Sequence, residues 1–303
     1  MIGQVWPRTG FPVLGSVSRP TIIVALGLIT VLGTSPAEAE DRVDSEHLFG
    51  FTEGSDIGSK GEREFKNETT LRAGKAAGSY AAGTSEAELK YTLSDNFRVS
   101  AGARLAYFDI NGVPGIGDAN RAEIQAASFS ARFRLLDRTK APIGMTLSVE
   151  PHWGFVDETK GLRIGHFGAE AAVLMDRELV LDRLLGALNI QFENDRVRPV
   201  APSIVRHESI MGFGLALATQ ASPGLWLGAE ARYLRSYDGA ALNALSGQAL
   251  YLGPTLFAAL PNNYWLSAAL DFQVRGRAVG IPGSLDLTNF ERYQARFRVG
   301  FSF

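Results

Sequence analysis

Residues 143–155 read IGMTLSVEPHWGF, and this stretch decides the fold because its side chains alternate between two kinds. The odd-numbered positions carry Ile, Met, Leu, Val, Pro, Trp and Phe, whereas the even-numbered positions carry Gly, Thr, Ser, Glu, His and Gly. Successive side chains of a β-strand point to opposite faces of the sheet. The stretch therefore predicts a strand with one apolar and one polar face.

The same period of two recurs along the chain from about residue 62. The candidate strands are 62–76, 80–93, 97–109, 123–135, 143–155, 163–175, 185–196, 208–219, 225–237, 248–260, 264–275 and 290–303. They are longer than the strands of soluble sheets, which usually have about 5–6 residues, and they suit a membrane barrel, which needs about 9–11 residues per crossing. The predicted fold is all-β, a transmembrane antiparallel up-and-down barrel of about twelve strands, with ten to fourteen compatible with the pattern.

The connections between these strands differ systematically in length. After the even-numbered strands they are mostly tight and polar, as at Ser94-Asp95-Asn96 and Pro261-Asn262-Asn263. After the odd-numbered strands they are often longer, as at 110–122, 197–207, 238–247 and 276–289. Outer-membrane barrels have short periplasmic turns and longer outer loops. We therefore expect both ends of the barrel chain on the periplasmic side.

The N-terminal residues have the pattern of an export signal. Arg8 and Arg19 precede the apolar run TIIVALGLITVLGT at 21–34, which is shorter than the roughly 20 residues of a spanning helix. Ala37-Glu38-Ala39 then supplies a small-x-small cleavage site. We expect a cleaved signal peptide at 1–39, a flexible periplasmic segment at 40–61 and the barrel at 62–303. An alternative for 40–61 is a plug that folds into the lumen.

Composition excludes several classes of function. The chain has no cysteine, which excludes thiolate metal sites and cysteine nucleophiles, and its net charge of −2 gives no basic footprint for nucleic acid. His207 and Ser209 share a parity, but no third member of a catalytic triad accompanies them, and no GxSxG motif is present. We therefore predict no catalytic residues and no cofactor; a lipid-acting outer-membrane enzyme is the least favoured alternative.

The C-terminal sequence YQARFRVGFSF, residues 293–303, alternates and ends in phenylalanine. It resembles the terminal assembly signal of Gram-negative outer-membrane β-barrels, with Tyr293, Phe297, Phe301 and Phe303 in the signal positions. The resemblance covers 62–303 and implies location in the outer membrane of a Gram-negative bacterium. It also implies contact with outer-membrane lipid and, during biogenesis, with the barrel assembly machinery and periplasmic chaperones.

A second resemblance lies near the mature N-terminus. The segment HLFGFTEG at 47–54, followed by Gly58 and Gly61, resembles the start of a poorly characterised proteobacterial barrel family. That resemblance implies no activity.

Aromatic residues gather near the strand ends, where interfacial girdles form in membrane barrels. The set expected at the outer end is Tyr107, Phe108, Trp153, Phe155, Tyr233, Tyr237 and Phe290. Trp226 and Trp265 break the parity of their strands, and only their position at a strand end is evident from the sequence.

The polar parity predicts a charged lumen. The expected cationic wall is Arg98, Arg104, Arg132, Arg134, Arg296 and Arg298, and the expected acidic wall is Glu86, Glu88, Glu150 and Glu170. Facing walls of opposite charge select small polar or charged solutes. We therefore expect a passive channel for small polar or ionic solutes. The alternative is a non-conducting structural or surface-interaction barrel with a side-chain-plugged lumen, whose loops near 110–122 and 276–289 contact a partner.

Two groups of potential metal ligands occur in the barrel sequence. His152 with Glu150, and His166 with Glu170, lie on adjacent strands and suit a divalent transition metal, although lumen histidines more often make ordinary hydrogen bonds. In the 110–122 region, Asp109, Asn111 and Asp118 are calcium-type ligands that more often build turns. The sequence prediction assigns no metal site and leaves the solute and the oligomeric state open.

Overall fold

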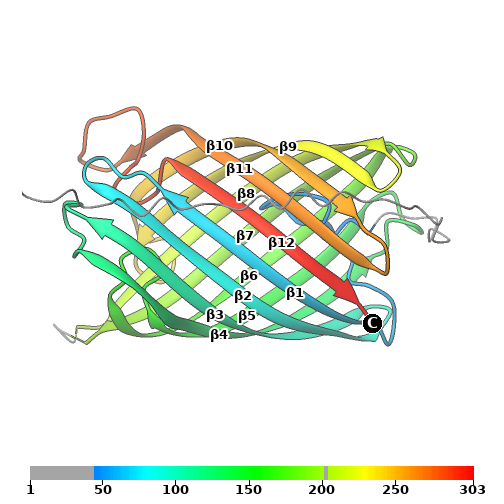
Figure 1. Ribbon diagram of the computed structural model, residues 1–303, viewed down its shortest axis with the longest axis horizontal. Helices are drawn as coiled ribbons and strands as arrows, with labels where there is room; N and C mark the ends of the chain where they lie inside the picture. The colour runs from blue at the N-terminus through cyan, green and yellow to red at the C-terminus, as the bar shows by residue number, and fades with distance from the viewer. Residues whose placement is uncertain (1–43, 201–203) are drawn as a thin grey trace, which may run out of the picture. The chain divides into compact units, whose positions relative to one another are not determined.

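The computed structural model describes residues 44–200 and 204–303 and confirms the predicted barrel, with twelve antiparallel strands that close when β1 pairs with β12 (Figure 1). The signal peptide expected at 1–39 lies outside the described residues. The strands are β1 Arg63–Ala73, β2 Ser79–Ser94, β3 Phe97–Asn111, β4 Ala119–Leu136, β5 Gly144–Val156, β6 Arg163–Val180, β7 Leu184–Pro199, β8 Arg206–Ser222, β9 Leu225–Asp238, β10 Ala244–Ala259, β11 Tyr264–Ala278 and β12 Tyr293–Ser302.

The two ends of the barrel differ in their connections. At the terminal end, where β1 begins and β12 ends, the turns are 95–96, 137–143, 181–183, 223–224 and 260–263. At the opposite end, the loop end, the connections are 74–78, 112–118, 157–162, 200–205, 239–243 and 279–292. Several strands run further toward the loop end than the sequence pattern predicts, so the loop expected at 110–122 shrinks to 112–118.

The outer face of the barrel is apolar. Side chains such as Leu105, Ile124 and Leu215 are more than half exposed on it. A closed sheet satisfies every backbone polar group internally, as lipid requires. In the part of the chain that the structure describes, no helix is long and apolar enough to span a membrane. Phe297 and Phe303 of the expected assembly signal are 48% and 63% exposed, and their role in assembly remains a prediction.

The aromatic girdle expected at the outer end is partly wrong. Tyr107, Trp153 and Phe155 are exposed, but Phe108, Tyr237 and Phe290 are buried. Phe290 lies in the 279–292 loop rather than in β12, and it packs with Tyr251 inside the loop end. This inward fold of the loop explains why β12 begins at Tyr293 instead of at the predicted residue 290.

The prediction of a flexible periplasmic segment at 40–61 is also wrong for residues 44–61, the part of it that the structure describes. Residues 44–61 are hereafter the plug; residues 45–57 lie inside the terminal end of the lumen, and residues 59–61 are exposed before β1 begins (Figure 1, blue). Ser45, His47, Phe49 and Ile57 are at most 1% exposed. The plug has no regular secondary structure, so its backbone polar groups bond largely to side chains of the barrel wall.

Candidate functional site

Glu46 is the main charged anchor of the plug. Its carboxylate is buried and contacts Lys90 Nζ at 2.8 Å, Arg132 Nη1 at 3.1 Å and the guanidinium of Arg98. Burial opposes ionisation, but Arg98 and Lys90 outweigh it and hold the pKa of Glu46 well below its usual range. The plug therefore supplies the anion that neutralises cations on β2, β3 and β4.

Wall side chains bind the plug backbone in return. Glu230 on β9 accepts hydrogen bonds from the N–H groups of Phe51 and Thr52, at 2.9 Å each. Asp176 on β6 accepts from the N–H of Ser55 at 3.0 Å and from its hydroxyl at 2.7 Å. The partners of Glu46 on β2, β3 and β4 lie across the barrel from β9, so the two sets of contacts together fix the plug across the lumen.

Two aromatic residues form an apolar seat for the plug. The His47 ring stacks on Trp265 with 3.8 Å between ring centroids, and Leu48 and Phe49 pack in one cluster with Trp226 and Trp265. Both tryptophans are buried inside the barrel. Their break in strand parity therefore has a structural reason, because they turn large apolar surfaces toward the plug.

We expect Trp226→Ala to lower the free energy of unfolding by about 3–5 kcal/mol, because it leaves a cavity beneath the plug. Trp226 is 1% exposed, whereas Trp153 is 47% exposed on the outer face, so Trp153→Ala is the matched control. Urea unfolding in lipid vesicles, followed by the heat-modifiable gel shift, measures both. Equal losses in the two variants would contradict this role of Trp226.

A polar cavity of about 160 Å³ lies between the plug and the middle of the wall. Its charged lining side chains are Glu53, Lys66, Glu68, Glu86, Glu88, Arg104, Arg132, Glu150, Glu170, Arg232 and Arg296. Glu53 belongs to the plug, and its Oε2 lies 2.5 Å from Arg132 Nη2. Burial opposes ionisation of Glu53, but Arg132, Lys66 and Arg298 lower its pKa from 4.5 to about 2.

The six arginines expected as one cationic wall have three different positions. Arg98, Arg132 and Arg298 contact the plug. Arg104 and Arg296 line the cavity, as Arg132 also does, and the guanidinium of Arg296 lies 4.3 Å from the ring centre of Phe51 in the plug. Arg134 lies at the terminal end, where it donates to the backbone carbonyl of Asp95 in the 95–96 turn.

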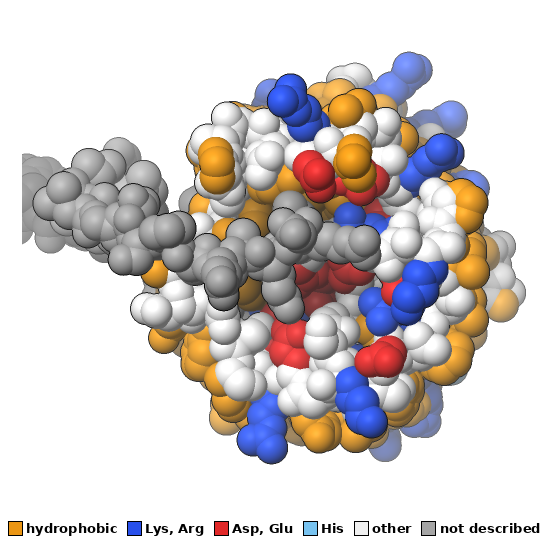
Figure 2. Space-filling model, turned by 90° about the vertical axis from the view of Figure 1, so that its right-hand side faces the viewer, with side chains coloured by type: hydrophobic (Ala, Val, Ile, Leu, Met, Phe, Trp, Pro, Cys, Tyr) orange, Lys and Arg blue, Asp and Glu red, His pale blue; other side chains and the backbone are white. Residues whose placement is uncertain are grey.

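All four expected acidic residues line the cavity, but they do not form a wall opposite the arginines. Glu86 and Glu150 bind the same guanidinium, that of Arg104, at 3.1 and 2.5 Å, and Glu88 lies 2.8 Å from Lys66 Nζ. The expected facing walls are therefore corrected to interleaved pairs, because β2 lies directly beside β3 in the barrel. Figure 2 shows acidic side chains inside the opening at the terminal end, and both acidic and basic side chains around its rim.

The sequence prediction missed the residues that place the plug. Glu46, Glu53 and Glu230 were not among the predicted site residues, although Glu230 lies on the polar parity of its strand. The two parity-breaking tryptophans were the signal in the sequence that something apolar occupies the lumen.

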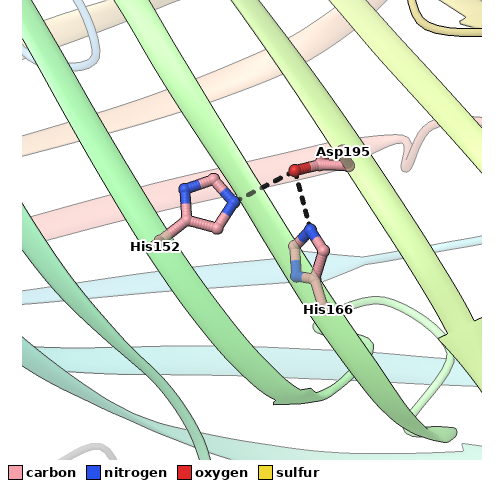
Figure 3. Close-up of side chains that lie close together, drawn as sticks. All are labelled: His152, His166 and Asp195. Atoms are coloured by element: carbon pink, nitrogen blue, oxygen red, sulfur yellow. Dashed lines mark hydrogen bonds and ion pairs between the residues drawn. The ribbon is translucent and has the colours of Figure 1, made fainter.

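His152 and His166 do come together, but with Asp195 rather than with Glu150 and Glu170 (Figure 3). Asp195 Oδ1 lies 3.1 Å from His152 Nε2 and 2.7 Å from His166 Nε2. Asp195 is on β7, so three adjacent strands contribute one residue each.

Three other groups of candidate ligands or nucleophiles already make hydrogen bonds or ion pairs within the protein. The hydroxyl of Ser209 donates to the Gly239 carbonyl at 2.8 Å. Asp118 accepts from the N–H of Gly112 at 2.8 Å, which agrees with a turn-building role. The Glu46–His47–Glu64 group at the plug is already surrounded by cations, Lys90 among them, and these oppose a bound metal ion.

Solved structures with a similar fold are outer-membrane barrels. The COG4313 outer membrane channel from Pseudomonas putida F1 superposes with a TM-score of 0.59 at 10% identity, covering 82% of this chain and 98% of the channel. The NanC porin gives 0.47 at 8% identity, covering 79% and 98%. The beta domain of the Bordetella autotransporter Brka gives 0.49 at 13% identity, covering 80% and 100%.

The likeness to the COG4313 channel confirms the fold of an outer-membrane β-barrel, and at 10% identity it shows the fold alone. None of the curated proteins matches the sequence. The sequence profile of DUF6662, described as a family of unknown function, matches residues 41–303, which include the plug and the whole barrel. The chain therefore belongs to this family of unknown function.

Proposed function

We propose that the protein is an outer-membrane channel through which small polar or ionic solutes diffuse passively, and that the plug closes it at rest. The charged cavity directly above the plug is the observation that carries this proposal. The cavity lies inside a closed barrel whose outer face is apolar. Its polar side chains can therefore bind a solute that would find no hydrogen-bond partners in the hydrocarbon of the lipid bilayer. The proposed transport needs no cofactor and no chemical step.

The lining of the cavity favours charged or strongly hydrogen-bonding solutes. Arg104 and Arg296 face acids within hydrogen-bonding reach, so each charge is locally balanced. A polar solute can exchange one of these partners for its own groups, whereas an apolar solute would leave charges without partners. Lipid contact and help from the assembly machinery and chaperones during biogenesis belong to the same proposal, as implied by the C-terminal signal.

Conduction requires the plug to move. Plug residues make polar contacts with β1 to β7, β9 and β12. His47 also stacks on Trp265 of β11, so movement of the plug must break both kinds of contact. Planar-bilayer recording of refolded 40–303 tests the proposal, with a heat-modifiable gel shift to show that the barrel has folded. We expect infrequent stepwise openings from the native sequence.

Substitution of the cavity charges should change the ion selectivity of those openings. In Arg104→Gln/Arg296→Gln the cavity loses two positive charges, so the reversal potential in a salt gradient should shift toward cation selectivity. In Glu150→Gln/Glu170→Gln it should shift the other way. Arg163 is an exposed residue at the loop end, and Arg163→Gln is the control. Identical reversal potentials in all variants would count against a path through this cavity.

A non-conducting structural barrel is the second candidate function. The plug and the inward-folded 279–292 loop, which favour it, occupy the two ends of the lumen. A folded barrel that shows no conductance in the bilayer, both as the native sequence and in a variant whose plug contacts are broken, would support this function and overturn the channel.

A further inference from the structure

We propose that His152, His166 and Asp195 form a binding site for a divalent transition-metal ion at the lumen wall. This inference goes beyond the proposed transport and does not depend on it. The site lies in the loop half of the barrel, away from the plug, and its residues come from β5, β6 and β7 (Figure 3).

All three side chains point into the lumen. Trp153 and Phe167, the residues that follow the two histidines, are 47% and 49% exposed on the outer face. Alternation therefore turns His152 and His166 inward. Their rings lie 4.9 Å apart between centroids, and the three ligand atoms are all within 4.8 Å of one another.

A glycine makes this arrangement possible. Gly168 on β6 stands in register between His152 on β5 and Asp195 on β7. A Cβ at position 168 would lie 1.8 Å from Asp195 Oδ1 and 2.7 Å from His152 Nε2. The missing side chain thus leaves the space in which the carboxylate and the imidazole meet.

Both imidazoles already approach the same carboxylate oxygen. His166 Nε2 is buried and lies 2.7 Å from Asp195 Oδ1, which is also 3.1 Å from His152 Nε2. Ligand atoms on a common tetrahedral ion are about 3.4 Å apart when each bond is about 2.1 Å. The observed separations of 3.1 and 2.7 Å from Asp195 Oδ1 reach this value with small side-chain rotations.

The donor set indicates the chemical class of the ion. Two imidazoles and one carboxylate suit zinc, nickel, cobalt or copper, whereas calcium and magnesium prefer oxygen ligands alone. Glu193 Oε1 lies 3.9 Å from His152 Nε2 and adds a second carboxylate beside the site. The side chains of His166 and Asp195 are 13% and 15% exposed, so an ion can reach them from the lumen.

Titration of the refolded 40–303 barrel with Zn²⁺ by calorimetry tests the site, and Co²⁺ provides a visible absorption spectrum that reports its ligands. We expect one ion per barrel and an increase in the thermal transition temperature when zinc is present, since an ion that binds only the folded state stabilises it. His166→Ala should weaken zinc binding by at least about 100-fold. His207→Ala, which removes an exposed histidine of β8, should leave binding unchanged.

Gly168→Ala is a second variant that retains all three ligand residues. Its new Cβ displaces the carboxylate of Asp195, so zinc binding should weaken by at least about 10-fold while the gel shift of the folded barrel persists. The proposal is overturned if the native barrel binds no zinc. It is equally overturned if His166→Ala and Gly168→Ala bind zinc as tightly as the native sequence, which would place the ion elsewhere.

Discussion

Glu46→Gln should change the barrel from one that opens rarely to one that opens often. The substitution preserves the shape of the side chain but removes the negative charge that Lys90, Arg98 and Arg132 share. Removing one partner of a buried ion pair costs about 3–5 kcal/mol, because the remaining charges are left uncompensated. That cost falls on the seated state of the plug, since the cations gain water when the plug leaves.

The expected increase in the ratio of open to closed times is about 100- to 4,000-fold, because each 1.4 kcal/mol corresponds to about a tenfold change in an equilibrium. Single-channel recording measures this ratio directly. Glu158→Gln is the matched control, because it removes one ion pair with Arg72 at the loop end. An open fraction that is the same in Glu46→Gln and in the control would show that the plug anchor does not govern conduction.

The barrel itself was predictable from the sequence because its signal is local. Every strand must alternate between lipid and lumen, so stretches such as 143–155 carry their own evidence, and β5 was found within one residue at each end. The loop end was less predictable. Arg292 continues the alternation of β12 in sequence, whereas Glu291 and Phe290 have the opposite parity. The packing of Phe290 with Tyr251 places this segment in the loop rather than in the strand.

The sequence of 40–61 does not by itself predict that this segment folds into the lumen as a plug, because the residues that hold the plug are far away in the chain. Glu46 is paired with residues up to Arg132, and Phe51 with Glu230. Short polar segments with several glycines and acids are also typical of flexible tails, so composition alone favours the wrong alternative. The inward tryptophans at 226 and 265 become interpretable only when the plug is in place.

The histidine cluster was half predictable. Parity and a hairpin bring His152 and His166 to the same face of adjacent strands, as the sequence analysis expected. The third member depends on the register of β7 against β6, which sets Asp195 opposite Gly168. Glu150 and Glu170 have the same parity, but they lie two and four residues nearer the middle of their strands. There both line the cavity, and Glu150 forms an ion pair with Arg104.

A disulfide between the plug and the wall should hold the channel closed. Thr52 and Gly214 are the suitable positions, because a Cβ at 214 would lie 3.0 Å from Thr52 Oγ1 and 3.7 Å from its Cγ2. The two Cβ atoms are thus about 4 Å apart, within the range of about 3.5–4.5 Å for disulfides. Thr52 Oγ1 makes no hydrogen bond, so Thr52→Cys removes none, and the native chain contains no other cysteine.

The most direct test of plug gating is single-channel recording of Thr52→Cys/Gly214→Cys in the Glu46→Gln background, first oxidised and then reduced in the same bilayer. The barrel carrying Glu46→Gln and Thr52→Cys alone, treated in the same way, controls for the reductant. We predict that the oxidised barrel stays closed and that reduction restores frequent openings. Openings of equal frequency and size before and after reduction would contradict the conclusion that the plug closes the channel.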